Sequence, residues 1–333
     1  MIIPAILHCL LLISGAGAGP DLSVSAQSLG PPVRAVRVEE LRLEPEPNEE
    51  AFLARPVFLA AEAGRVYVAD GLDCAIKVFS EDGRFEASLG RKGQAPGEFS
   101  FPSGVSAHGG RLYVADKFNR RIQILNAAGH PLGGFPVPFF PDRVFALAPD
   151  RILVTRNPSA GPGPQKRLLL YDQGGTLVWE GLEAFASGDT VYDTFRNMIL
   201  VNPGPDGGFL VVFRSHERSI LRFGPDGSLV GRVPVDERLP FQPMSLPVSG
   251  PEKTLLGFCW ASALDSGLLY LLPPESVDGR DLGPGRRVVA VDAAGRLRET
   301  IDLPRPVSAI AVAGRRLFVV DAEGRLGIFR ILR

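Results

Sequence analysis

Short runs of consecutive hydrophobic residues recur along the whole chain, and turns rich in glycine separate them. The run Leu112–Ala115, for example, is apolar at every position. A strand with one solvated face alternates apolar and polar residues, whereas an uninterrupted run indicates a strand that is covered on both faces. Pairs such as Asp82-Gly83 and Asp226-Gly227 follow several runs, and such pairs favour the tight turn of a β-hairpin. The pattern therefore predicts an all-β protein of antiparallel strands packed in layers.

These runs belong to a repeat. The segment GRVYVADG at Gly64 closely matches GRLYVADK at Gly110, and weaker copies begin at Asp150, Gly207, Gly267 and Gly314. The spacing of roughly 40 to 60 residues suits propeller blades of four short strands. Six copies predict six blades. The two longest spacings predict inserted loops, which we place at 181–195 and 234–253.

The repeat resembles the NHL type found in exported bacterial β-propellers. Residues 93–126 contain G-x-F, P-x-G-V, G-x-L-Y-V-A-D and N-x-R-I-Q in that order. The resemblance covers 55–135 closely and 204–233 and 285–331 more weakly. It implies a six-bladed β-propeller with four-stranded antiparallel blades, in a single domain over 33–333. It also implies that the aspartate of V-A-D braces a blade loop together with nearby polar residues, here Asp70 and Asp116 with Asn119 and Arg121.

The last copy lacks one strand. It offers an inner strand at Val307–Val312, a second at Arg316–Val320 and a third at Arg325–Leu332. The segment Val33–Leu43, VRAVRVEELRL, has the composition of a strand and no partner of its own. We therefore expect the N-terminal strand to complete the last blade, which closes the ring and protects an exposed sheet edge.

The first 18 residues contain no charged side chain, and an apolar centre is followed by Ala16-Gly17-Ala18. This pattern predicts a signal peptide at 1–18, followed by a flexible leader at 19–32 and a periplasmic or secreted protein with no membrane span in the mature chain. An uncleaved anchor remains the alternative. The formal net charge is −1 and no basic stripe occurs, which argues against a nucleic-acid partner. We expect a monomer with two buried thiols, Cys74 and Cys259.

No catalytic or metal-binding motif emerges from the chain. The histidines that would remain after cleavage, His108, His130 and His216, fall in loops on both faces of a propeller and cannot converge on one zinc ion. Calcium lactonases with this fold begin the first inner strand with Glu, but residues 55–59 read RPVFL, and Asp142 with Asn197 supplies too few oxygen ligands. We therefore predict no cofactor and no metal. A lyase or lactonase-type enzyme with a metal site in the propeller channel remains the alternative function.

Aromatic residues and arginines gather in the loops that join the outer strand of one blade to the inner strand of the next. These loops form one rim of a propeller, and binding residues are often carried by such loops. The sequence therefore predicts a non-catalytic recognition or scaffold module that binds a protein, peptide or glycan through the rim. The candidate ligand-binding residues are Arg143, Phe185, Tyr192, Phe195, Arg196 and Phe241.

Overall fold

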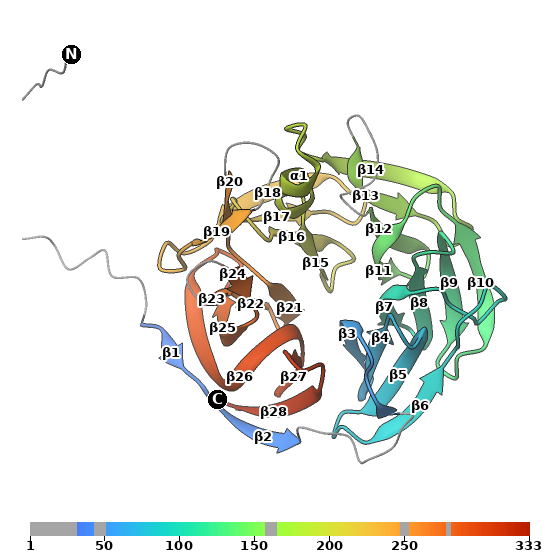
Figure 1. The fold of residues 1–333 in the computed structure, drawn as a ribbon, viewed down its shortest axis with the longest axis horizontal. Helices are drawn as coiled ribbons and strands as arrows, with labels where there is room; N and C mark the ends of the chain where they lie inside the picture. Colours follow the sequence, from blue (N-terminus) through green and yellow to red (C-terminus); the bar gives the residue numbers. More distant parts are fainter. Residues whose placement is uncertain (1–31, 43–50, 157–164, 247–252, 278–280) are drawn as a thin grey trace, which may run out of the picture. The chain divides into compact units, whose positions relative to one another are not determined.

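The chain forms a six-bladed β-propeller, as the sequence predicts (Figure 1). The computed structural model describes residues 32–42, 51–156, 165–246, 253–277 and 281–333, and Val33–Arg333 forms one compact unit. The predicted signal peptide and nearly all of the predicted leader lie outside the described residues. No helix in the described part of the chain is long and apolar enough to cross a membrane.

Blades one to four are separate four-stranded antiparallel sheets, each running in chain order from the inner to the outer strand. Their second strands begin within two residues of the glycines and the aspartate that mark the repeat. The blades are, in order, β3 (Pro56–Glu62), β4 (Arg65–Asp70), β5 (Ala75–Ser80) and β6 (Phe85–Leu89); β7 (Pro102–His108), β8 (Arg111–Asp116), β9 (Arg121–Asn126) and β10 (Pro131–Pro136); β11 (Pro141–Ala148), β12 (Arg151–Arg156), β13 (Lys166–Tyr171) and β14 (Leu177–Glu183); β15 (Ile199–Pro203), β16 (Phe209–Phe213), β17 (Ser219–Phe223) and β18 (Leu229–Pro234).

Blades five and six share one long strand. β26 (Leu297–Ala313) has 17 residues; its first part is the outer strand of blade five and its last part is the inner strand of blade six. Blade five also contains β21 (Ala261–Asp265), β22 (Leu268–Leu272) and β25 (Gly285–Val291), and blade six contains β27 (Arg316–Asp321) and β28 (Leu326–Leu332). The two blades therefore form one continuous sheet.

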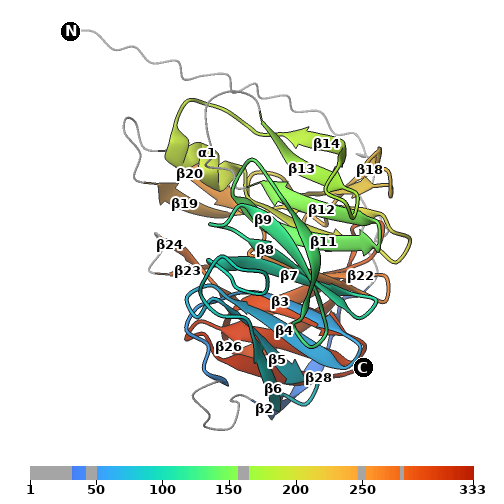
Figure 2. The same cartoon turned by 90° about the vertical axis from the view of Figure 1, so that its right-hand side faces the viewer.

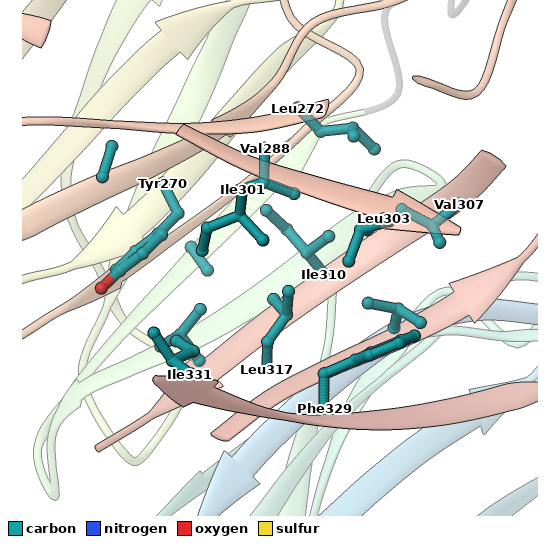
Figure 3. Packing of buried hydrophobic residues seen from close by; sticks show 14 of the residues in the cluster. Tyr270, Leu272, Val288, Ile301, Leu303, Val307, Ile310, Leu317, Phe329 and Ile331 are labelled. Carbon is teal, nitrogen blue, oxygen red and sulfur yellow. The ribbon is translucent and has the colours of Figure 1, made fainter. Parts of the chain in front are cut away.

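The N-terminal strand closes the ring, as predicted. β2 (Arg37–Arg42) pairs antiparallel with β28 and becomes the outer strand of blade six. An interaction that the sequence did not reveal precedes it: β1 (Arg34–Ala35) pairs in parallel with the outer-strand part of β26. Val36, between the two strands, is 5% exposed and belongs to the core shared by blades five and six. Figure 3 shows other members of this core, such as Ile301 and Ile331. The N-terminal segment thus fastens both of the last two blades.

The hydrophobic core lies between adjacent blades, which explains why the strands are apolar on both faces. One cluster, for example, joins Phe58 of blade one and Phe145 of blade three to strands of blade four. Close contact also selects glycine in the turns. Gly175 in the β13–β14 turn has φ +85, and a Cβ there would lie 2.3 Å from the Cβ of Phe135 in blade two. Only glycine permits both that backbone conformation and that approach.

Three inserted elements lie on one face of the ring (Figure 2). The insertion at 181–195 contains the helix α1 (Thr190–Arg196), which Asp189 caps by accepting a hydrogen bond from the backbone N–H of Tyr192. The insertion at 234–253 leads into the hairpin β19 (Gln242–Leu246) and β20 (Lys253–Gly257). A third element, the hairpin β23 (Glu275–Val277) and β24 (Asp281–Gly283), interrupts blade five between β22 and β25. Because strands alternate in direction, all three occupy the face that carries the outer-to-inner connections.

Candidate functional site

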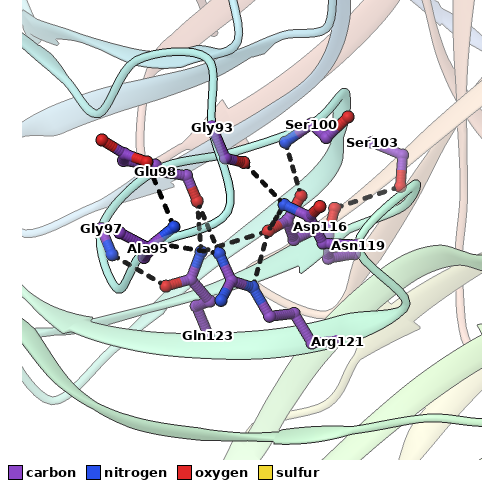
Figure 4. Close-up of polar contacts among 11 residues, drawn as sticks. Gly93, Ala95, Gly97, Glu98, Ser100, Ser103, Asp116, Asn119, Arg121 and Gln123 are labelled. Carbon is purple, nitrogen blue, oxygen red and sulfur yellow. Dashed lines mark hydrogen bonds and ion pairs between the residues drawn. The ribbon is translucent and has the colours of Figure 1, made fainter.

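The brace in blade two is formed as the repeat implies (Figure 4). Asp116 is fully buried, and its carboxylate accepts hydrogen bonds from Ser100 N at 2.7 Å, Asn119 Nδ2 at 2.8 Å and Arg121 Nε at 2.8 Å. Arg121 also donates to the carbonyl oxygens of Ala95 and Glu98. Asp70 braces the corresponding loop of blade one, where its carboxylate accepts hydrogen bonds from four backbone N–H groups. These residues therefore hold the loops that carry them.

A channel runs through the middle of the ring between the inner strands. Its main cavity has a volume of about 490 Å³ and extends from Arg143, near the start of β11, to His108, at the end of β7. Since these residues lie at opposite ends of their strands, the cavity connects the two faces of the propeller. Phe58, Phe145, Leu200 and Trp260 contribute much of its apolar lining.

A second cavity of about 260 Å³ lies at the channel mouth on the face that carries the insertions. We call it the arginine pocket, because Arg143, Arg156, Arg167 and Arg214 line it. Asp142 is the single carboxylate among its lining residues. Its remaining walls are mainly apolar and come from β3, β11, α1 and β15. Four guanidinium groups beside one carboxylate make this a strongly positive site in a chain whose formal net charge is −1.

The four arginines differ in how they are held. Arg143 donates to the carbonyl oxygens of Ser103 at 2.6 Å, Asp142 at 3.0 Å and Val57 at 3.2 Å, so it ties the inner strands of blades one to three together. Arg214 lies over the ring of Trp260, 4.5 Å from its centroid. Arg156 and Arg167 each bury an Nε atom that has no hydrogen-bond partner among the described residues.

Burial sets the electrostatics of the pocket. Arg167 is 4% exposed, and this burial lowers the pKa of its guanidinium to about 9 despite the opposing attraction of Asp142. Burial also lowers the pKa of Arg214. With a pKa of about 9, Arg167 still carries a positive charge at neutral pH, and a charge held away from water attracts an anion more strongly than one on the open surface.

Three of the predicted rim residues lie together. Tyr192 is 6.2 Å from Phe185 between ring centroids, and the guanidinium of Arg196 lies over Phe185 at 4.8 Å. His216, in the β16–β17 loop, joins them, with its Nε2 3.4 Å from Tyr192 Oη. We call these four residues the rim cluster. Phe185 is 43% exposed, so the cluster presents an accessible aromatic surface.

The other predicted residues lie elsewhere. Arg143 belongs to the arginine pocket. Phe195 lines a separate, mostly apolar cavity of about 230 Å³ with Met198 and Trp260. Phe241 is partly buried: it packs against Phe258, with ring centroids 6.0 Å apart, at the edge of the core between blades four and five. The insertions therefore distribute their aromatic residues between the surface and the core.

His216 connects the rim cluster to the inserted hairpin. Its backbone N–H donates to the carbonyl oxygen of Leu256 in β20, and the backbone N–H of Leu256 donates to its Nε2 at 3.4 Å. Burial, and then the nearby charge of Arg196, lower the pKa of His216. No group of three or more histidine, cysteine or acidic side chains in the described part of the chain is placed to hold a metal ion.

The comparisons with known proteins agree on the fold. Residues 46–151 match the model of the family DUF5128, described as a 6-bladed β-propeller. The chain is similar to a member of the DUF4221 family from Bacteroides vulgatus, with 12% identity, a TM-score of 0.60 and coverage of 88% of this chain and 98% of that one. It is also similar to a candidate exported protein from Bacteroides fragilis, with 10% identity, a TM-score of 0.58 and coverage of 89% and 96%.

A catalytic propeller is among the similar structures. A catalytically inactive variant of virginiamycin B lyase from Staphylococcus aureus, solved with quinupristin, has 11% identity to this chain and a TM-score of 0.51. The match covers 86% of this chain and 83% of the lyase. At such low identity these likenesses show the propeller fold alone. No curated protein matches the chain in sequence.

Proposed function

We propose that this protein is an exported recognition module whose ligand binds at the channel mouth, on the face that carries the insertions. One observation carries the proposal: the arginine pocket and the three inserted elements occupy the same face, and Thr194 of α1 lines the pocket. Loops on a rigid scaffold can change their shape and chemistry without unfolding the core, so binding sites are often built there. Export itself rests on the predicted signal peptide.

The opposite face supports this assignment by contrast. Its connections are short turns, several of them with glycine at positive φ, such as Gly64, Gly110 and Gly227. Such turns offer little surface for recognition. The rim cluster, in contrast, combines exposed aromatic rings with an arginine, and these residue types contribute most to binding energy at interfaces.

The proposal can be tested by screening the purified protein against a display library of peptides and a glycan array. We expect at least one enriched ligand, and Tyr192→Ala should weaken its binding by about 1 kcal/mol or more. His130→Ala, in a turn on the opposite face, is the control and should bind as the wild type does. If enriched ligands bind both variants equally well, the assigned face is wrong. Metal-dependent turnover of a lactone or a cyclic peptide would instead favour an enzyme.

A further inference from the structure

Blades two and three can be compared position by position because their strands pair in the same register. Asp116 pairs with Pro102 in blade two, and Arg156 pairs with Pro141 in blade three. The second and third strands of the two blades also pair in the same register: Ala115 is opposite Ile122 in blade two, and Thr155 is opposite Leu168 in blade three. Arg156 therefore occupies the position of Asp116. Arg167, which directly precedes Leu168, occupies the position of Arg121.

The exchange removes a counter-ion from the blade. In blade two the guanidinium of Arg121 lies 2.8 Å from the carboxylate of Asp116. Blade six repeats the arrangement, with Arg325 Nε 2.8 Å from Asp321. In blade three an arginine stands where the carboxylate would be.

Among the described residues, no carboxylate forms an ion pair with Arg156 or Arg167. Asp142, the acidic residue that lines the arginine pocket, is 33% exposed and lies 3.5 Å from Arg143. Residues 157–165, between β12 and β13, read NPSAGPGPQ and contain no acidic residue. The Nε atoms of Arg156 and Arg167 are buried without a hydrogen-bond partner among the described residues. Burying an unpaired guanidinium nitrogen is costly, because it loses its hydration without gaining a hydrogen bond.

We propose that Arg156 and Arg167 bind the carboxylate of an organic acid ligand, which takes the place that Asp116 and Asp321 fill in blades two and six. A carboxylate accepts paired hydrogen bonds from guanidinium groups in a directed geometry. The apolar body of the ligand would pack against Phe58, Phe145 and Met198, which line the same cavity. This inference rests on the proposed function and names the chemistry of its ligand. The carboxylate can come from a free acid, from a peptide C-terminus or from a uronic acid.

Calorimetric titration of the full chain with defined probes tests the inference. The probes are 3-phenylpropionate, an N-acetylated dipeptide with a free C-terminus, and glucuronate, which represent the three sources. The amide of each probe and inorganic phosphate are the ligand controls. We expect at least one carboxylate to bind and its amide to bind about tenfold more weakly or not at all. Phosphate binding as tight as the best carboxylate would overturn the assignment of a carboxylate.

Two variants separate the pocket from the rest of the surface. Arg167→Gln removes the buried charge and should weaken carboxylate binding about tenfold or more. Arg156→Asp restores the arrangement of blade two, so it should abolish binding while raising the melting temperature of the unliganded protein. Arg111→Gln makes the same change of charge at the start of β8, on the opposite face, and should bind within about twofold of the wild type.

Each outcome bears on one proposal. If no carboxylate binds, or if both pocket variants bind a carboxylate as tightly as the wild type does, the inference is wrong. The proposed function would still stand in that case if Tyr192→Ala loses a peptide or glycan ligand. If carboxylate binding depends on Arg167 while no macromolecule is sensitive to the rim cluster, the pocket assignment holds and the wider recognition function fails.

Discussion

Blades two and three have the same strands in the same register, yet they use their charged residues in opposite ways. In blade two, Asp116 and Arg121 satisfy one another and the loop around them. In blade three, Arg156 and Arg167 line a cavity, and the buried Nε atom of each has no hydrogen-bond partner in the part of the chain that the structure describes. The aspartate of the brace occurs in blades one, two and six, as Asp70, Asp116 and Asp321, whereas blade three has Arg156 at this position. The carboxylate site that we propose therefore lies where blade three departs from the repeat.

The largest expected effect is the loss of the brace in blade two. Asp116→Ala should lower the free energy of unfolding by about 3–5 kcal/mol, because it removes the acceptor of Arg121 Nε and of several other donors. Arg156→Ala, at the equivalent position of blade three, should cost less than about 1 kcal/mol or stabilise the protein, since Arg156 forms no ion pair with a described residue. Urea denaturation measures both values. Equal losses would mean that blade three has a brace of its own.

A second comparison concerns the aromatic residues of the insertions. Phe241→Ala should lower the free energy of unfolding by about 2 kcal/mol, because the ring packs in the core between blades four and five. Phe185→Ala should cost about 0.5 kcal/mol or less, because that ring is exposed. Thermal melting of the two variants checks this order. The reverse order would assign Phe241 to the binding surface and Phe185 to the core.

The smallest expected effect is a pH dependence at His216. Because burial lowers its pKa in the folded protein, the unfolded chain binds more protons below the unfolded pKa of about 6.5. The contribution to stability is therefore complete above pH 7.5 or so, and it is lost as the pH falls through the window between the unfolded and the lowered folded pKa.

The melting temperature of the wild type should accordingly fall further between pH 7.5 and 5 than that of His216→Gln. Glutamine offers an acceptor to Leu256 but does not titrate, and all other groups are the same in both proteins. If the melting temperatures of the wild type and of His216→Gln fall by the same amount between these pH values, protonation of His216 does not affect stability.

The sequence predicted the ring well because the repeat is strong in its first two blades. Local signals mark the ring: a glycine precedes the second strand in five of the six copies, Asp-Gly pairs mark several turns, and Val33–Leu43 has the composition of a strand. The second strands begin close to the predicted anchors. The continuity of β26 was not predicted, because Pro304 and Pro306 within its 17 residues favour a break between two shorter strands. The hairpin β23–β24 was missed for a related reason: it is too short to produce a recognisable pattern.

The binding role of the candidate residues stays a prediction. The structure brings three of them together in the rim cluster, places Arg143 in the arginine pocket, and packs the partly buried ring of Phe241 against the core between blades four and five. Arg156 and Arg167 were not singled out, although a signal was present. The third copy of the repeat reads V-T-R where the first two read V-A-D. Only the cavity and the missing partners distinguish that exchange from an ordinary surface substitution.

The closing strand also bears on the order in which the protein can fold during synthesis. Glu39 of β2 bonds to Arg330 of β28, a residue 291 positions further along the chain. A ribosome that adds some 5 to 20 residues each second completes the first blades many seconds before β28 emerges. The early blades can form as they appear, but β2 has to wait unpaired. Ring closure is therefore a late step, and anything that occupies the N-terminal strand in that interval would delay it.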